Sequence, residues 1–204
     1  MNLNGSFPSD VAFSPAVKDV QHRKGSRHAY ERMESERGWA TAIDQVLKEM
    51  IESQASVFLA TASADGQPYI QHRGGPPGFL HVLDECTIAF ADFTGNRQYI
   101  TSGNLAENDR AQLFLLDYAT RSRVKVWGTA RMVDDDPALV ERLMPPGYSA
   151  RAEQALVFTV KAWDTNCSRH IPQRFEAADV AAALAARDAR IEALERTVQE
   201  LRGR

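Results

Sequence analysis

Two polar segments contain residues that could bind an anion, and each follows a strand-like run. The first is "QHRGG", residues 71–75, and the second is "DFTGNRQ", residues 92–98. The guanidinium groups of Arg73 and Arg97 offer planar sets of donors that match a phosphate. Glycines expose backbone N–H groups, and a helix starting near Gln98 adds a favourable dipole. Together the segments predict a site for a phosphorylated cofactor, although composition alone favours solvated arginines and turn glycines.

Other familiar catalytic and cofactor motifs are absent from the sequence. It has no G-x-G-x-x-G after a strand, no P-loop, no G-x-S-x-G elbow and no H-E-x-x-H. The five histidines are scattered, and Cys86 and Cys167 lack the spacing of metal ligands. We therefore expect no metal site, and neither a dinucleotide fold nor a serine hydrolase.

Composition indicates a globular protein. The chain has 204 residues, of which 44% are hydrophobic and 25% charged, enough for one domain with a core. A net charge of -3 argues against nucleic-acid binding, which normally needs a basic surface. The chain has neither a signal-peptide pattern nor an apolar stretch approaching the ~18 residues of a membrane span. We expect a cytoplasmic protein without nucleic-acid or membrane partners.

Seven apolar runs separated by turn residues predict β strands. Their short spacing favours antiparallel pairing, because parallel neighbours need a crossover of a dozen or more residues. The sequence therefore predicts a mainly β fold with flanking helices, arranged as an antiparallel barrel or sandwich. The runs are "SVFLATAS", "PYIQHR", "FLHVLD", "TIAFADF", "AQLFLLDY", "RVKVWGTARMV" and "ALVFTVKAW".

Three helices are expected around these strands. Thr41 and Asp44 approximate a capping box, and apolar residues recur at helical spacing from Ile43 to Ile51. "RQYITSGNL", residues 97–105, predicts a short helix. Another helix is predicted after Asp136, with that residue as N-cap and Pro137 at the first helical position.

The two ends of the chain differ from its middle. Residues 1–38 are polar and irregular, which predicts an arm laid over the domain or a partly disordered segment. Residues 39–176 form the expected barrel domain. Residues 177–204 predict an amphipathic helix that either docks on its own domain or forms a short dimeric coiled coil. Its apolar residues follow a three-four alternation, interrupted by Arg187: Val180, Leu184, Ile191, Leu194, Val198 and Leu201.

The residues of the two anion-binding segments and their surroundings resemble a known family. "ASADGQPYIQHRGGPPGFL", residues 62–80, and the run from Ile88 to Met132 resemble the FMN-binding split β-barrel of the pyridoxamine 5'-phosphate oxidase-related flavoproteins. The resemblance covers about residues 55–165. "AWDTNCSRHIPQRF", residues 162–175, also resembles a subgroup known only as flavin-nucleotide-binding oxidoreductases.

The resemblance implies a homodimer with two FMN molecules at its interface. Arg97 is the implied phosphate ligand, and Arg123 and Trp127 are implied to reach the flavin of the partner chain. Gly74 and Gly75 are implied to let the main chain approach the flavin ring, the alternative being an ordinary glycine-rich hairpin. The implied cofactor-binding residues of the chain's own barrel are Gln71, His72, Arg73, Gly74, Gly75, Ala91, Asp92, Asn96, Arg97 and Gln98.

The resemblance implies a flavin-dependent oxidoreductase of unknown small-molecule substrate. Pro76 and Gln98 stand where the true oxidases have lysines, and the C-terminal motif differs, which argues against vitamin B6 oxidation. No catalytic residue is assigned; His170 and Arg174 are substrate-side candidates, or parts of a packed connector. The alternatives are a flavin carrier, store or redox sensor without turnover, and the same barrel binding F420 or haem.

Overall fold

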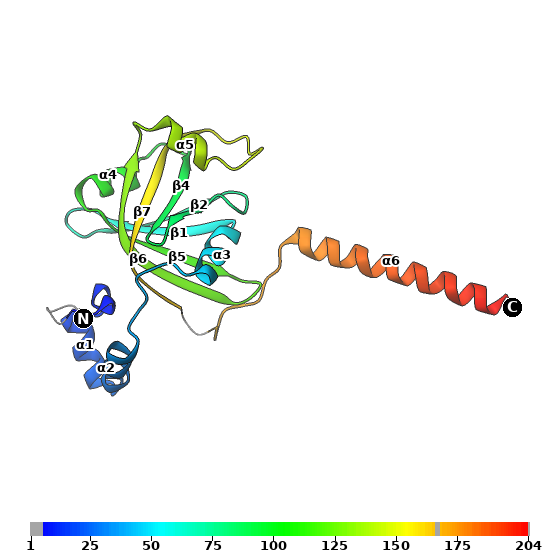
Figure 1. Cartoon of the computed structure of the whole chain (residues 1–204), viewed down its shortest axis with the longest axis horizontal. Coiled ribbons are helices and arrows are strands. Elements are labelled where there is room, and N and C mark those ends of the chain that lie inside the picture. The colour runs from blue at the N-terminus through cyan, green and yellow to red at the C-terminus, as the bar shows by residue number, and fades with distance from the viewer. Residues whose placement is uncertain (1–5, 166–167, 204) are drawn as a thin grey trace. The chain divides into compact units, whose positions relative to one another are not determined.

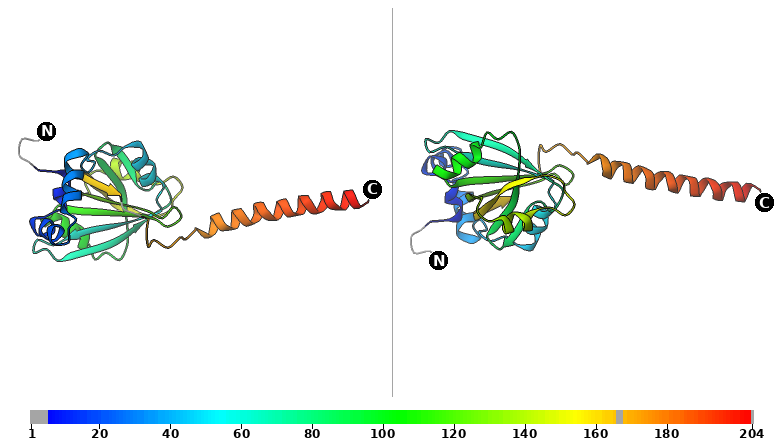
Figure 2. Two further views of the ribbon diagram at one scale, coloured as in Figure 1. Left: turned by 90° about the horizontal axis from the view of Figure 1, so that it is seen from below. Right: turned by 90° about the horizontal axis from the view of Figure 1, so that it is seen from above.

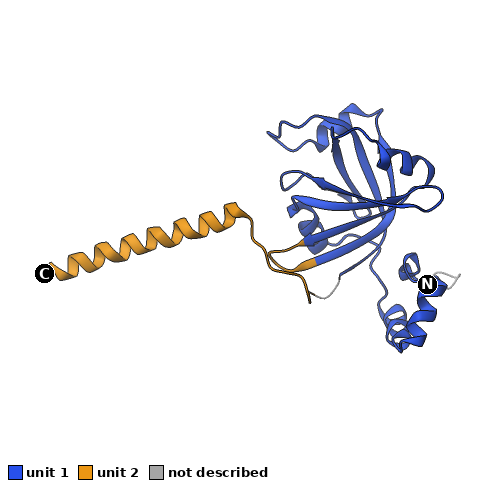
Figure 3. Ribbon diagram, turned by 180° about the vertical axis from the view of Figure 1, so that it is seen from behind, with its two compact units in different colours: residues 1–116, 123–167 blue, residues 117–122, 168–204 orange. Residues whose placement is uncertain are grey.

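The computed structural model describes residues 6–165 and 168–203 (Figure 1). These residues divide into two compact units (Figure 3). The first runs to Leu116 and resumes at Arg123, and it contains the sheet and the N-terminal helices. The second contains the Asp117–Ser122 turn and the chain from Ser168 onward. The expected domain limits at residues 39 and 176 stay a prediction.

Seven strands form one sheet, as the sequence predicts. The sheet order is β2-β1-β5-β6-β7-β4-β3, and it curves strongly (Figure 2). β1 pairs with β2 and β5, β4 with β3 and β7, and β6 with β7, all antiparallel. The strands are β1 (Ser56–Ala62), β2 (Pro68–Gly74), β3 (His81–Asp84), β4 (Thr87–Phe93), β5 (Arg110–Asp117), β6 (Ser122–Val133) and β7 (Ala152–Thr165).

One face of β6 supplies the core, whereas β4 and β7 have buried residues on both faces. In β6 buried and half-buried residues alternate, because side chains of a strand point to opposite faces in turn. Each large core side chain contributes about 1.5–3 kcal/mol by its burial. The largest of the fully buried side chains include Phe79, Phe90, Phe158, Leu59 and Leu113. The other face of β6 carries Arg123, Lys125 and Trp127, which are half-buried and available to a site.

Three helices flank the strands: α3 (Gln45–Ser53), α4 (Ile100–Glu107) and α5 (Pro137–Leu143). Asp136 caps α5 by accepting a hydrogen bond from the Leu139 N–H at 2.8 Å, as predicted. The prediction that α3 opens at Thr41 is wrong. Asp44 is its N-cap, because its carboxylate accepts from the Leu47 N–H at 2.7 Å.

Part of the N-terminal segment expected to be irregular is helical. It contains the 3₁₀ helix η1 (Pro8–Val11), α1 (Pro15–Arg23) and α2 (Arg27–Glu36). Ser14 caps α1 through the Val17 N–H, and Pro15 occupies its first position. These helices were not predicted from the sequence, because local caps and a tertiary polar network stabilise them despite their polar composition.

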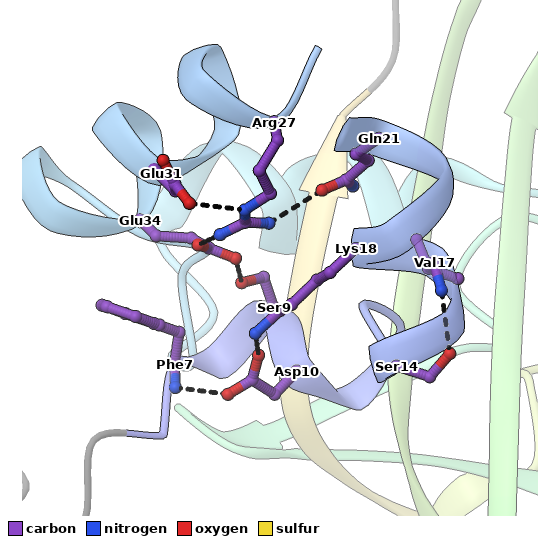
Figure 4. A network of polar contacts seen from close by, with 10 residues as sticks. All are labelled: Phe7, Ser9, Asp10, Ser14, Val17, Lys18, Gln21, Arg27, Glu31 and Glu34. Atoms are coloured by element: carbon purple, nitrogen blue, oxygen red, sulfur yellow. Dashed lines mark hydrogen bonds and ion pairs between the residues drawn. The ribbon is translucent and has the colours of Figure 1, made fainter. Parts of the chain in front are cut away.

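A buried ion pair holds η1, α1 and α2 together (Figure 4). The Arg27 guanidinium pairs with Glu34 and donates to the Gln21 side-chain oxygen at 2.7 Å. The Ser9 hydroxyl donates to the other Glu34 oxygen at 2.9 Å. Because the Glu34 side chain is fully buried, its charge depends on these partners.

We expect Glu34→Gln to loosen these helices. Leaving the Arg27 charge buried without its carboxylate costs about 3–5 kcal/mol, so protease cleavage within residues 8–36 is expected to accelerate at least about tenfold. Glu31→Gln is the matched control, since Glu31 also pairs with Arg27 but its side chain is 53% exposed. Equal acceleration by both variants would contradict the role of the buried pair.

The described residues include a long C-terminal helix, α6 (Ala177–Arg202), as predicted. None of its residues is buried. Among the described residues, no helix is both long enough and apolar enough to span a membrane. The same residues hold no group of three or more histidine, cysteine or acidic side chains placed to bind a metal.

Candidate functional site

A pocket of about 170 Å³ joins the two segments singled out in the sequence. Gln71 and Arg73 enter it from β2, and Asp92 from the end of β4. The loop from Gly95 to Tyr99 and the first turn of α4 close one side, and Glu153 of β7 closes another. The structure thus brings Gln71, Arg73, Asp92, Asn96, Arg97 and Gln98 together.

Arg73 and Asp92 form an ion pair on the floor of the pocket. Arg73 Nη1 lies 2.7 Å from Asp92 Oδ1, an attraction of charges without the angles of a hydrogen bond. Arg73 Nη2 donates to the Thr101 hydroxyl at 3.2 Å, and Gln154 donates to Asp92 Oδ2 at 2.9 Å. Arg73 Nε is buried and has no hydrogen-bond partner among the described residues. A buried donor without an acceptor is costly, so an acceptor that reached this nitrogen would be stabilised there.

The loop before α4 has a left-handed backbone at two residues that are not glycine. Arg97 has φ 60° and Tyr99 has φ 54°. Such conformations cost roughly 1–2 kcal/mol per residue and persist only where surrounding contacts impose them. Here the Asn96 side-chain oxygen accepts from the Gln98 N–H at 3.2 Å, which fixes the bend. The loop therefore presents Arg97 at the mouth of the pocket.

The first turn of α4 also faces this pocket. Its N-cap is Tyr99, and no side chain caps it. Ile100, Thr101 and Ser102 of that turn line the pocket. The first N–H groups of a helix have no partner within the helix and carry the positive end of its dipole. This turn therefore adds anion-binding capacity beside the two arginines.

Arg97 remains charged at the rim. Its Nε donates to the Tyr99 hydroxyl at 3.0 Å, and that hydroxyl donates to Glu153 at 3.2 Å. The hydrogen bond to Tyr99, together with the charges of Tyr99 and Glu153, raises the pKa of Arg97. Because the guanidinium is exposed and held only by the hydroxyl, its remaining donors can bind an incoming anion.

The residues present fit the phosphate end of FMN. The buried donor of Arg73, the exposed fork of Arg97 and the uncapped turn of α4 all favour a phosphate. At Gly95 nothing lies within 4 Å of a would-be Cβ, so the loop backbone is open. Asp92 and Glu153 place opposing charges in the same pocket. Phosphate binding therefore competes with these two carboxylates for the arginines.

Several predicted cofactor residues lie outside this pocket. His72 is exposed, and its ring packs edge-on against Phe58 at 5.7 Å. Ala91 is buried in a hydrophobic cluster. At Gly75 a Cβ would lie 2.7 Å from the Phe79 Cβ, so packing alone requires glycine there. At Gly74 it would lie 3.0 Å from the His72 ring. A flavin contact by His72, Ala91, Gly74 or Gly75 stays a prediction.

Arg123 and Trp127 lie on the outward face of β6. Arg123 Nε is buried without a hydrogen-bond partner. The Trp127 ring stacks on Trp39 at 4.6 Å and 15°, and the Lys125 ammonium lies 5.0 Å from the Trp127 ring centre. Trp39, Lys125 and Trp127 are among the residues that line a separate hollow of about 540 Å³. Within one chain, therefore, this face of β6 is not part of the Arg97 pocket.

Asp164, in the hollow beside Lys125, gives a pH-dependent prediction. Burial raises the pKa of its carboxyl, opposed in part by Lys125 and Arg37. An acid with a raised folded-state pKa stabilises the fold most when protonated, and this contribution disappears as pH rises through that pKa.

Asp164→Asn removes this titration. We therefore expect the free energy of unfolding of the wild type, relative to the variant, to fall as the pH rises above about 4. Urea unfolding of both proteins across this range measures the difference. A difference that rises with pH would mean that the Lys125 ion pair outweighs burial.

His170 and Arg174 lie in the second unit. His170 is exposed with φ 66°. The Arg174 guanidinium lies 4.7 Å from the Tyr118 ring centre, and the backbone N–H of Arg174 donates to the Tyr118 carbonyl at 3.3 Å. Gln173 donates to the Ala119 carbonyl at 2.9 Å. These contacts support the interpretation as a packed connector, and a substrate-side role stays a prediction.

The two predicted segments leave out six pocket residues: Tyr69, Tyr99, Ile100, Thr101, Ser102 and Glu153. Tyr99 and Thr101 follow Arg97 closely, so the segment could have been extended across the predicted helix start. Glu153 carries no local signal, because the pairing of β7 with β4 brings it to the pocket.

Comparison with known proteins now assigns the family. The family model described as Pyridoxamine 5'-phosphate oxidase matches residues 43–167. The chain therefore belongs to the pyridoxamine 5'-phosphate oxidase-like family of flavin-binding proteins. A search of the curated proteins found no significant match.

Solved structures show the same fold. HupZ of Group A Streptococcus is 17% identical over 65% of this chain and 99% of that chain, with a TM-score of 0.50. This similarity confirms the predicted split β-barrel. A Clostridium acetobutylicum protein related to general stress protein 26 is 20% identical, covering 68% of this chain and 99% of that one, with a TM-score of 0.44. An FMN-binding protein from Syntrophomonas wolfei is 14% identical, covering 74% and 97%, with a TM-score of 0.45.

Proposed function

We propose that this protein binds FMN and uses it as an oxidoreductase on a small organic substrate not yet identified. The observation that carries the proposal is the pocket at the start of α4. It combines the unpartnered Nε of Arg73, the exposed guanidinium of Arg97 and an uncapped helix N-terminus. Family membership supports a flavin as the ligand. F420 is the alternative to FMN, since an F420 reductase is among the structures similar to this chain.

Two protomers are proposed to share the flavin sites. Arg123 and Trp127 project from the same face of β6, and the buried Nε of Arg123 has no acceptor among the residues that the structure describes. A flavin held by the partner would supply such an acceptor. The homodimer is therefore part of the proposal, and a monomer by light scattering at micromolar concentration would count against the shared site.

The chain's own residues bind and orient the cofactor. Arg97 and the first turn of α4 hold the phosphate, with Arg73 beneath them. Arg73, His72 or the partner's Arg123 places positive charge beside the polar edge of the flavin ring. When bound, the flavin supplies hydride transfer, and the protein contributes orientation and electrostatics.

The first experiment is an absorption spectrum of the freshly purified protein, followed by heat release and mass identification of any chromophore. Bound FMN supports the proposal. If the protein is colourless, the apo form is titrated with FMN, riboflavin, F420 and haem. Uptake of F420 or haem without uptake of FMN would overturn the cofactor assignment.

Turnover is tested separately from binding. Reduction of the bound flavin by NADH or NADPH under anaerobic conditions, followed by repeated reoxidation, supports an enzyme. A protein that binds FMN tightly but shows no steady-state turnover with either donor and a panel of acceptors is instead a flavin carrier or redox sensor.

A further inference from the structure

The apolar side chains of α6 follow a heptad pattern. With Leu184, Ile191 and Val198 at position a, the d positions hold Val180, Arg187, Leu194 and Leu201. A repeat of 3.5 residues keeps such a seam on one side of a helix that supercoils with a partner. Leu at d with Ile and Val at a, as in the C-terminal half of α6, favours a parallel coiled coil of two helices.

The side chains of this seam are exposed in the part of the chain that the structure describes. The six large apolar side chains of α6 are 43–65% exposed: Val180, Leu184, Ile191, Leu194, Val198 and Leu201. Burying a side chain of this size stabilises a complex by about 1.5–3 kcal/mol at most, so a helix of 26 residues exposes considerable binding energy. The outer face of α6 is charged instead, and Arg196 lies 4.0 Å from Glu192 one turn earlier.

The flanking charges select a partner of the same sequence. In a parallel pair, position g of one helix faces position e of the next heptad in the other. Here Arg190 at g faces Glu195 at e of the second copy, and the symmetry of the pair makes this contact twice. Arg187 enters the seam at d, beside Asp188 at e of the second copy. Opposite charges therefore meet at both places. In register the two Arg187 side chains also face each other at d, which costs stability in the middle of the seam.

An antiparallel pair would be opposed by the same charges. In that orientation e faces e and g faces g across the seam. The register with the longest overlap, in which Ala177 faces Leu201, sets Arg190 against Arg190 and Asp188 against Asp188. Shifting by one heptad, so that Leu184 faces Leu201, sets Asp188 against Glu195 of the other helix. Like charges meet in either register, which costs stability.

We propose that α6 pairs with α6 of a second copy of this chain in a parallel, in-register coiled coil over residues 180–201. No residue of this interface lines the pocket at the start of α4. The partner of the exposed seam is a helix of identical sequence. It depends neither on FMN binding nor on turnover, so it can fail while the proposed function stands.

The test uses the full chain with Cys86 and Cys167 replaced by serine. Leu201→Cys places a thiol at d, and Gln199→Cys is the matched control at b on the outer face. Under mild oxidation, the rate of disulfide-linked dimer formation is expected to be at least about tenfold higher for Leu201→Cys. In the antiparallel register of longest overlap position 201 faces Ala177, which leaves the two thiols about 36 Å apart along the axis; they are still about 25 Å apart where it faces Leu184.

A charge exchange tests the register. In the Leu201→Cys background, Arg190→Glu is expected to slow cross-linking several-fold, because the introduced carboxylate would then face Glu195 of the other helix. Adding Glu195→Arg is expected to restore the rate to within about twofold. Equal rates at positions 199 and 201, or no recovery in the double exchange, would overturn the proposal. The flavin content of each variant, measured in parallel, reports on the barrel independently.

Discussion

Arg97→Ala is expected to weaken FMN binding by about 10- to 100-fold. A hydrogen bond to a charged group contributes about 1.5–3 kcal/mol, and each 1.4 kcal/mol is about a factor of ten in affinity. Arg97 is exposed at the pocket rim, and its substitution removes no core packing. The fold should therefore be unchanged, and fluorescence titration of the apo protein with FMN measures the loss.

Riboflavin separates phosphate binding from ring binding. Because riboflavin lacks the phosphate, Arg97→Ala should leave its affinity within about twofold of the wild type. Arg131→Ala, which removes another exposed arginine, on β6 and outside the described pocket, is the matched control and should change neither affinity. An equal loss for FMN and riboflavin would place the phosphate away from Arg97.

Gly128→Ala is expected to destabilise the barrel severely. A Cβ at this position would lie 2.0 Å from the Thr159 carbonyl oxygen and 2.6 Å from the Phe158 ring. The position adjoins a register shift between β6 and β7, and backbone on both strands limits relaxation. Overpacking of this kind costs about 1–3 kcal/mol or more, which lowers the melting temperature by roughly 2–12 °C for a domain of this size.

Gly103→Ala is the matched control. Gly103 lies inside α4, and nothing lies within 4 Å of a Cβ built there. Alanine is favoured over glycine in a helix by about 0.8–1 kcal/mol, so this variant should melt at the same or a higher temperature. Differential scanning fluorimetry compares the two. A Gly128→Ala protein as stable as the wild type would mean that β6 and β7 separate there easily.

The strands could be predicted because their signals are local. Alternating and β-branched runs end at turn residues, so all seven were found from the sequence. The helices of residues 8–36 were missed because a tertiary contact stabilises them: Arg27 and Glu34 are polar residues that composition assigns to solvent, yet both are buried. The start of α3 was misplaced because two polar residues, Thr41 and Asp44, could each begin a helix.

About half of the residues that line the pocket could be predicted, because they stand in segments with a local signal. Arg73 and Arg97 stand in recognisable segments, and sheet pairing brings those segments together. The ion pair of Arg73 with Asp92 and the link from Arg97 through Tyr99 to Glu153 depend on side-chain positions that no local pattern encodes. Sequence reasoning therefore located the cationic groups and missed how they are neutralised.

The carboxylates that neutralise these arginines bear on how the protein acquires its cofactor. With Asp92 beside Arg73 and Glu153 linked to Arg97, the pocket is charge-balanced before any phosphate arrives. The protein can then fold without its cofactor. When the cofactor binds, its phosphate replaces the carboxylates of Asp92 and Glu153 as the partner of the arginines. Such an exchange is reversible, so the fraction of protein carrying cofactor should follow the concentration of free flavin in the cell.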